Sequence, residues 1–232
     1  MDKLRWLTWR IAKGWRQPLH VLVGKASLAG NGYVSGDSVS YGEVGPGVFS
    51  VVLSDGMGCG RKASEESRLI VQTVDHLLRA GYSPPLALQV TNAVMLHRSR
   101  DGEESYSTLD LALIDLYSGN LQLYKTGASL TLIRRGKRLG IVTMSSLPMG
   151  VVGDLPVPLW KYRLRSGDQI FLLSDGVAEA GRRQGIHWLR DTILGQPSSD
   201  PQEAAEFLIR QARMRLGEKE KDDMTAVVIV VQ

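Results

Sequence analysis

Two segments of the chain end in the same four residues, Leu-Ser-Asp-Gly, and in both an apolar run leads up to the aspartate. Asp55 follows the run 48–53, and Asp175 follows the run 170–173. Both runs are typical of buried strands, so each carboxylate is predicted to lie where a sheet reaches the surface. Side chains at such edges are well placed to bind and transform a ligand.

Two further acidic sites have the same relation to a predicted strand. Asp222 and Asp223 stand directly before the apolar run 224–231. Asp37 follows a candidate strand over residues 20–26 and a glycine-bearing turn. The sequence therefore predicts acidic side chains at four strand ends.

An Asp-Gly pair is also common in tight turns, so each of the two repeated segments could simply be a hairpin corner. A hairpin needs a second strand directly after the turn. After Asp55 the chain continues through a glycine-rich stretch, 56–60, into the helical pattern of residues 62–79. After Asp175 comes the short run 177–180. Neither site is typical of a two-strand corner, which weakens the turn interpretation.

Gathering carboxylates in one cleft is unfavourable, because like charges repel and lose their hydration, and a divalent cation removes that penalty. Mg²⁺ and Mn²⁺ prefer such oxygen ligands. The histidines stand far apart without ligand spacing, which argues against zinc, and we expect them to be packed or solvated residues; they are His20, His76, His97 and His187. The acids therefore predict a magnesium or manganese site.

The composition favours one enzyme-sized domain. The chain has 232 residues, of which 43% are hydrophobic and 22% charged, and no Pro/Ser-rich linker divides it. The single cysteine, Cys59, excludes an internal disulfide and suits a reducing compartment. No apolar stretch approaches the roughly 18–20 residues that cross a bilayer, and no secretory signal is evident. We expect a cytoplasmic protein.

The net charge of +4 is concentrated at the N-terminus, where residues 1–16 hold five basic residues and one acid. Their apolar residues recur at helical spacing, so residues 1–19 predict a basic amphipathic helix or linker; they include Leu4, Leu7, Ile11 and Trp15. Docking on the domain or on a second copy is favoured over a membrane-surface role. Nucleic-acid binding is disfavoured, because no basic aromatic surface continues into the domain.

The order of predicted elements indicates an α+β fold with antiparallel sheets, because adjacent strands come in runs and helices are segregated between them. Residues 108–115 and 120–126 form a predicted hairpin with alternating faces. The other predicted strands lie near 20–27, 33–41, 47–54, 130–138, 170–173 and 224–231. Helices are predicted over 62–79, 84–99 and 201–216.

Seven short motifs, taken in order, resemble the metal-dependent PP2C-type (PPM) protein serine/threonine phosphatases. Within them, the chain most resembles the C-terminal phosphatase domains of the stage II sporulation protein E family, over about residues 20–232. Each motif alone is unspecific, whereas the ordered set is specific. The motifs are 35–38 (SGDS), 54–58 (SDGMG), 107–111 (STLDL), 125–129 (KTGAS), 147–150 (LPMG), 174–176 (SDG) and 222–225 (DDMT).

The resemblance implies a PP2C-like sandwich of two antiparallel β-sheets flanked by helices, with two Mn²⁺ or Mg²⁺ ions at one edge. It also implies a role for each acid. Asp55 would bridge both ions and the Gly56 carbonyl would bind one of them. Asp175 and Asp222 would hold the other ion, and Asp37 would act through a water molecule. Asp223 and Arg61 are expected to lie behind the metal ligands.

The implied reaction is direct hydrolysis of phosphoserine by a hydroxide formed on the metal pair, without a side-chain nucleophile. The implied substrate is a phosphorylated anti-sigma-factor antagonist in the control of a sporulation sigma factor. Two features depart from the family: Cys59 stands where a polar residue is expected, and no arginine is evident to grip the phosphate, although Arg61 and Lys62 lie near the predicted cleft.

Several alternatives stay open. The glycines Gly56, Gly58 and Gly60 could belong to a nucleotide-binding loop, although their spacing differs from G-x-G-x-x-G. The domain could instead bind phosphoproteins without hydrolysing them. A homodimer could form through the N-terminal helix or the helix within 60–80, and that helix is a candidate activity switch. The family's parent proteins have a membrane-spanning N-terminal region, so a C-terminal fragment of a membrane-anchored protein is another interpretation.

Overall fold

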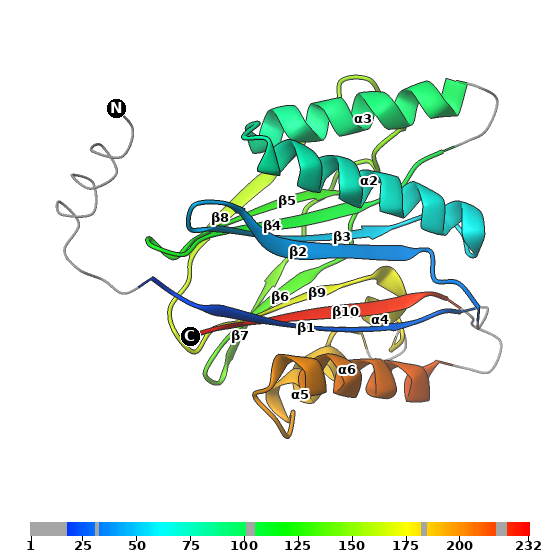
Figure 1. The fold of residues 1–232 in the computed structure, drawn as a ribbon. Helices are drawn as coiled ribbons and strands as arrows, with labels where there is room; N and C mark the ends of the chain where they lie inside the picture. The colour runs from blue at the N-terminus through cyan, green and yellow to red at the C-terminus, as the bar shows by residue number, and fades with distance from the viewer. Residues whose placement is uncertain (1–17, 31–32, 101–104, 182–184, 217–221) are drawn as a thin grey trace, which may run out of the picture.

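The computed structural model describes residues 18–30, 33–100, 105–181, 185–216 and 222–232. The predicted N-terminal helix therefore lies outside the described residues. Within them, the chain forms two five-stranded sheets that lie face to face, with helices on both outer sides (Figure 1). All strand pairings in both sheets are antiparallel.

The first sheet joins the two ends of the chain. Its strands, in spatial order, are β1 (Val21–Leu28), β10 (Met224–Val231), β9 (Gln169–Leu173), β6 (Thr131–Arg135) and β7 (Arg138–Val142). The second sheet is built from the middle of the chain. Its order is β2 (Asp37–Gly45), β3 (Val48–Asp55), β4 (Leu109–Asp115), β5 (Asn120–Thr126) and β8 (Leu159–Arg163).

Helices cover the outer face of each sheet (Figure 1). Two of them, α2 (Arg61–Arg79) and α3 (Pro84–Arg100), lie on the second sheet. The first sheet is covered by α5 (His187–Leu194) and α6 (Pro201–Arg215), and the single turn α4 (Asp175–Ala178) continues directly from β9. Four layers result, with the two sheets in the middle.

Strand β10 is apolar at every position except Thr225, and all eight of its residues are buried. Met224 and Val228 face the layer of α5 and α6, whereas Val227 and Ile229 face the second sheet. Because successive side chains of a strand point to opposite faces, a central strand covered on both sides is expected to be apolar at nearly every position.

The predicted fold class and the main predicted elements are confirmed. Both sheets are antiparallel, and the hairpin of β4 and β5 has the predicted bounds within one residue. Four elements were not predicted from the sequence: the edge strands β7 and β8, the single turn α4 and the helix α5. The segment 130–138, expected to be one strand and a turn, belongs to the hairpin of β6 and β7.

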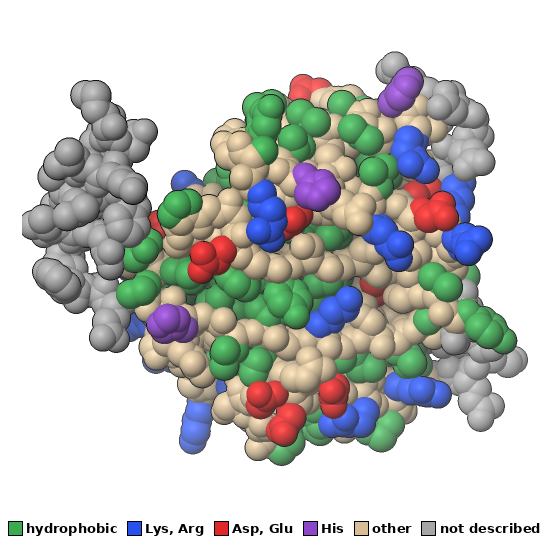
Figure 2. All heavy atoms as spheres, viewed as in Figure 1, with side chains coloured by type: hydrophobic (Ala, Val, Ile, Leu, Met, Phe, Trp, Pro, Cys, Tyr) green, Lys and Arg blue, Asp and Glu red, His purple; other side chains and the backbone are tan. Residues whose placement is uncertain are grey.

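Lys, Arg, Asp and Glu side chains are interspersed on the face shown in Figure 2, without separation of the two signs. The described residues include no helix that is long and apolar enough to cross a membrane.

Candidate active site

Strand pairing brings Asp37 and Asp55 together. Asp37 begins β2 and Asp55 ends β3, and the two residues are direct partners in the antiparallel register. The next residue, Gly56, donates its N–H to the carbonyl oxygen of Gly36 over 3.2 Å, which ties the two chain segments beyond the sheet. One half of the predicted acid cluster therefore belongs to the second sheet.

The other half comes from the first sheet. Asp175 follows β9, and Asp222 stands two residues before β10. These ends are held together because Ser174 donates its N–H to the carbonyl oxygen of Thr225 over 2.9 Å, and the Ser174 hydroxyl accepts the N–H of Thr225 over 2.8 Å. Both halves thus lie at the same edge of the sandwich.

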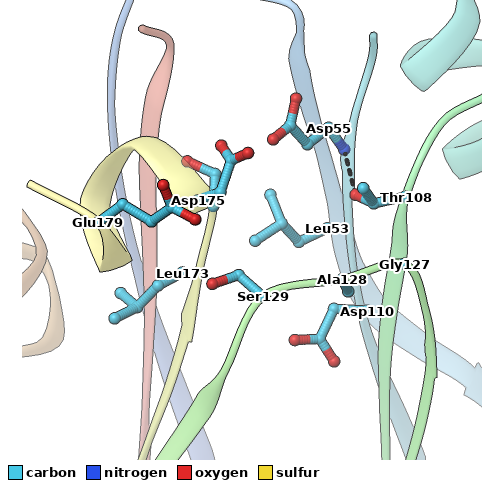
Figure 3. A pocket seen from close by; sticks show the side chains of 11 residues that line it. Leu53, Asp55, Thr108, Asp110, Gly127, Ala128, Ser129, Leu173, Asp175 and Glu179 are labelled. Carbon is cyan, nitrogen blue, oxygen red and sulfur yellow. Dashed lines mark hydrogen bonds between the residues drawn. The ribbon is translucent and has the colours of Figure 1, made fainter. Parts of the chain in front are cut away.

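A pocket of about 190 Å³ opens between the two halves. Asp55 and Asp175 point toward each other across it, with Glu179 beside Asp175 and Asp110 at the opposite end (Figure 3). Its other lining residues are Leu53, Thr108, Gly127, Ala128, Ser129, Leu173 and Ser174, so none of the described residues that line it is Lys or Arg. It is an acidic pocket suited to a cation.

The charges of these acids act on one another. Burial, followed by the charges of Asp37 and Asp175, raises the pKa of Asp55 to about 10. Burial also raises the pKa of Asp37 to about 6, although nearby hydroxyl groups of Thr225 and Ser174 oppose the rise. The pKa of Asp222 is raised as well, first by burial and then by the charge of Asp175. The four acids therefore act on one another as one electrostatic cluster.

The donor set fits a hard divalent cation. Both carboxylate oxygens of Asp37 are buried and accept no hydrogen bond from the described residues, which is costly unless another group binds them. Within the described residues, no three acidic, histidine or cysteine side chains are arranged to hold a metal ion as they stand. The carboxylates suit a divalent cation in their chemistry and location, but they must rotate before three of them can hold one ion.

Asp223 has a different position from its neighbour Asp222. It is buried, and its two carboxylate oxygens each accept one backbone N–H: Oδ1 that of Gly30 over 2.7 Å, and Oδ2 that of Gly36 over 2.6 Å. Gly36 directly precedes Asp37. Asp223 thereby holds the chain segment that delivers Asp37, in keeping with the supporting role expected for it.

We expect Asp223→Asn to weaken Mn²⁺ binding severalfold. An amide can accept only one of the two N–H bonds, and its NH₂ group then faces the other donor, at a cost of about 1–3 kcal/mol. Isothermal titration calorimetry with Mn²⁺ measures the change. Asp115→Asn is the matched control, because Asp115 also accepts two backbone N–H groups, those of Tyr117 and Ser118, but through a single oxygen at the β4–β5 turn. Equal Mn²⁺ affinity in both variants would contradict this role.

Two sequence expectations concern the loop after Asp55. Arg61 is the first residue of α2, is exposed and does not line the pocket. Cys59 is exposed too. Of the sequence-predicted site residues, Asp55 and Asp175 line the pocket, whereas Asp37, Asp222 and Arg61 are not among its lining residues.

Sequence reasoning missed the side chains that hold Asp55 itself. The Thr108 hydroxyl accepts the N–H of Asp55 over 3.0 Å, and the Ser107 hydroxyl donates to the Asp55 carbonyl oxygen over 2.6 Å (Figure 3 shows the bond to Thr108). Both residues lie in the motif 107–111, so their place in that motif was the available signal. Asp110, in the same motif, reaches the end of the pocket.

The four-layer fold, with acids at one edge of the sandwich, is the fold of PP2C phosphatase domains. These domains are enzymes, and this chain is one of them. Its structure matches that of the PP2C phosphatase domain and a fragment of the regulatory domain of SpoIIE from Bacillus subtilis. The TM-score is 0.85 and the identity 31%, over 94% of this chain and 64% of the other.

The family is shown by the sequence as well. The family described as Stage II sporulation protein E (SpoIIE) matches residues 45–232. The chain is 35% identical over 223 residues to stage II sporulation protein E of Bacillus subtilis (strain 168), and 34% identical over 206 residues to that of Priestia megaterium. These matches cover 94% and 88% of this chain, but only 27% and 35% of the relatives. The chain belongs to the stage II sporulation protein E family.

The pocket also bears on the nucleotide-binding alternative. The stretch containing Gly56, Gly58 and Gly60 leads from β3 into α2, as such a loop would. However, Asp55 and Asp175 present negative charge where a pyrophosphate would have to bind. The alternative is not favoured.

Proposed function

We propose that this domain is a metal-dependent protein serine phosphatase that uses two Mn²⁺ or Mg²⁺ ions. The observation that carries the proposal is the meeting of Asp37, Asp55 and Asp175 at one edge of the sandwich, where burial, followed by the charges of Asp37 and Asp175, raises the pKa of Asp55 to about 10. Such a cluster is unstable alone and is relieved by divalent cations. The match to PP2C phosphatase domains supports phosphate ester hydrolysis as the reaction of this site.

Each acid then has a role. Asp55, between the other two, would contact both ions, with the Gly56 carbonyl beside it. Asp175 and Asp222, on the first sheet, would bind the second ion. Asp37, whose oxygens are buried and unpartnered, would orient the attacking water molecule. When bound, the ions would lower the pKa of that water and neutralise charge on the phosphoryl group.

The chain's residues support the reaction by holding these carboxylates in place. Ser107 and Thr108 fix the backbone of Asp55, and Asp223 fixes the segment before Asp37. No side chain needs to act as a nucleophile. Because none of the described residues that line the pocket is Lys or Arg, the bound cations would also supply the positive charge that attracts a phosphate.

The substrate that we propose is phosphoserine on an anti-sigma-factor antagonist. The support is the family match over residues 45–232 and the identity of about a third to stage II sporulation protein E from two bacteria. The dephosphorylated antagonist would then release a sporulation sigma factor from its inhibitor.

A Mn²⁺-dependent assay on a phosphorylated antagonist protein tests the proposal. We expect phosphate release that stops on chelation with EDTA and returns when Mn²⁺ is added in excess. Parallel binding measurements separate hydrolysis from the alternative of an inactive scaffold. Saturable binding of the phosphorylated protein, with no phosphate release at any Mn²⁺ concentration, would favour the scaffold and overturn the proposed activity.

A further inference from the structure

A fully buried ion pair lies beneath the acidic pocket. Lys125 of β5 is 0% exposed, and its ammonium group pairs with Oδ2 of Asp110 on β4, whose side chain is 2% exposed. Thr131, the first residue of β6, bridges them: its hydroxyl accepts from Lys125 Nζ over 2.8 Å and donates to Asp110 Oδ2 over 2.7 Å. These three residues are called the buried triad below.

The buried triad connects the two sheets, because Asp110 and Lys125 belong to the second and Thr131 to the first. The space between the sheets is otherwise filled by an apolar cluster of buried residues from both, such as Leu53 and Leu172. A charged pair in such surroundings loses its hydration, and replacing it by apolar side chains is often neutral or stabilising. Stability alone therefore does not explain why the pair is there.

The buried triad is paired, in each sheet, with the strand that leads to an acid of the pocket. In the second sheet, Asp110 is the register partner of Leu53, two residues before Asp55. In the first sheet, Thr131 is the partner of Leu172, three residues before Asp175. The buried triad thus has one end beside each of the two strands that lead to the facing carboxylates. Figure 3 shows Asp110 at the end of the pocket away from them.

The buried triad also anchors the chain where it crosses between the sheets. Lys125 lies near the end of β5 and Thr131 begins β6, so the crossing residues 127–130 are held at both ends. Gly127, Ala128 and Ser129 of this crossing line the pocket. Ser146 adds a tie, since its hydroxyl donates to the Lys125 carbonyl oxygen over 2.9 Å and accepts the N–H of Gly127 over 3.2 Å.

The two charged residues differ in their access to the pocket. Asp110 lines its end, and Oδ1 of Asp110 is buried without a hydrogen-bond partner among the described residues. Lys125 is fully buried and does not line the pocket, so it cannot grip a substrate phosphate directly. Its charge is committed to Asp110 and Thr131.

We propose that Lys125, Asp110 and Thr131 are positioning residues that fix the separation of the two sheets beneath the acidic cluster. With that separation fixed, Asp55 from one sheet and Asp175 from the other can share a pair of divalent ions. The proposal rests on the proposed function, because it assigns the buried triad to the metal site of the same reaction. It predicts that the buried triad governs ion affinity more than folding.

The main test replaces both charges by apolar side chains of similar size, in Lys125→Met/Asp110→Leu. In EDTA, we expect this double variant to melt at or above the temperature of the unaltered domain. Calorimetric titration with Mn²⁺ should show at least tenfold weaker binding, and half-maximal phosphatase activity should need correspondingly more Mn²⁺. The KM for the phosphorylated substrate at saturating Mn²⁺ should change little. A merely structural role would move the melting temperature and leave the Mn²⁺ affinity unchanged.

Thr131→Val is the second variant, since it keeps the shape of the side chain and removes only the hydroxyl bridge. We expect severalfold weaker Mn²⁺ binding in a folded domain. Arg135→Gln/Asp168→Asn is the matched control. It removes another ion pair with a buried aspartate, between the last residue of β6 and the residue before β9. This pair lies at the opposite end of the first sheet, so the control should leave Mn²⁺ affinity unchanged.

Unaltered Mn²⁺ affinity in both the double variant and Thr131→Val would overturn the proposal, and so would equal weakening in the control. If the double variant does not fold, Thr131→Val decides alone. Calorimetry needs no turnover, so the two proposals fail separately. A domain whose Mn²⁺ affinity depends on the buried triad but that hydrolyses nothing would refute only the activity. An active domain whose variants bind Mn²⁺ as the unaltered domain does would refute only the positioning role.

Discussion

Asp55→Asn is expected to abolish metal-dependent phosphate release while raising the melting temperature of the metal-free domain. The loss of activity should exceed about 100-fold, because even residues that only support metal ligands cost 10–100-fold when changed. Asp55 lies between Asp37 and Asp175, and both charges act on it. An asparagine side chain keeps the shape but supplies no negative charge to a cation.

The gain in stability has the same physical origin. Because the pKa of Asp55 is raised to about 10, the folded metal-free domain keeps its proton where the unfolded chain, with a pKa of 3.8, has lost it. The unfolded state therefore binds fewer protons, and the free energy of unfolding falls as pH rises above about 4, by up to about 1.4 kcal/mol per pH unit. Asparagine has no proton to lose, so its contribution does not change with pH.

Thermal melts in EDTA at pH 5, 7 and 9 measure this effect. The melting temperature of the unaltered domain should fall with pH more steeply than that of Asp55→Asn, and Mn²⁺ should raise it only in the former. Asp115→Asn, remote from the pocket, should follow the unaltered domain. Substantial Mn²⁺-dependent activity in Asp55→Asn would contradict the ligand assignment, and a lower melting temperature in EDTA would contradict the electrostatic account.

Local patterns carried most of the correct sequence predictions. The apolar runs before Asp55 and Asp175, and after Asp223, are long enough to indicate buried strands, and they place the acids at strand ends without knowledge of the fold. The same local patterns do not show which strands pair with one another. β1 pairs with β10 across nearly the whole length of the chain, and no local pattern specifies that pairing. The ordered set of family motifs implied the sandwich of two sheets, but it did not specify this pair.

Two kinds of feature were missed: elements without a periodic apolar pattern, and contacts between residues whose pairing no local sequence pattern shows. Strand β8 is an edge strand whose residues alternate between exposed and half-buried, so no strong apolar run marks it. Asp110 and Lys125 each interrupt an apolar strand, and either alone is most simply interpreted as a solvent-facing position. Only the register of β4 on β5, which makes the two residues partners, shows that the charges meet in the interior.

One edge of the sandwich therefore contains two arrangements that each destabilise the folded, metal-free domain. The acids at the surface repel one another, and the pair beneath them is buried in an apolar layer. A domain selected for stability alone would avoid both. The two costs have different remedies, because cations relieve the repulsion between the acids, whereas Thr131 and the mutual attraction of Lys125 and Asp110 offset the burial of the pair.

Gly56→Ala is expected to damage both folding and catalysis. Gly56 is buried between β3 and the start of α2, and a Cβ atom there would stand 2.1 Å from the carbonyl oxygen of Ala63 and 2.8 Å from its Cα. Ala63 lies in the first turn of α2, so the clash is with backbone, and no side-chain rotation can relieve it. Either the first turn of α2 or the segment that carries Asp55 must move.

Such overpacking costs about 1–3 kcal/mol, which should lower the melting temperature of a domain of this size by about 2–12 °C. Mn²⁺-dependent activity should fall more than about tenfold, because the displaced segment includes Asp55 and the Gly56 carbonyl proposed to bind an ion. Gly45→Ala is the matched control: Gly45 stands at the end of β2 with nothing within 4 Å of the added Cβ, and its φ does not require glycine. If Gly56→Ala and Gly45→Ala have the same melting temperature and activity, α2 can move away from the added Cβ without loss of stability. Its contact with Gly56 would then not hold Asp55 in place.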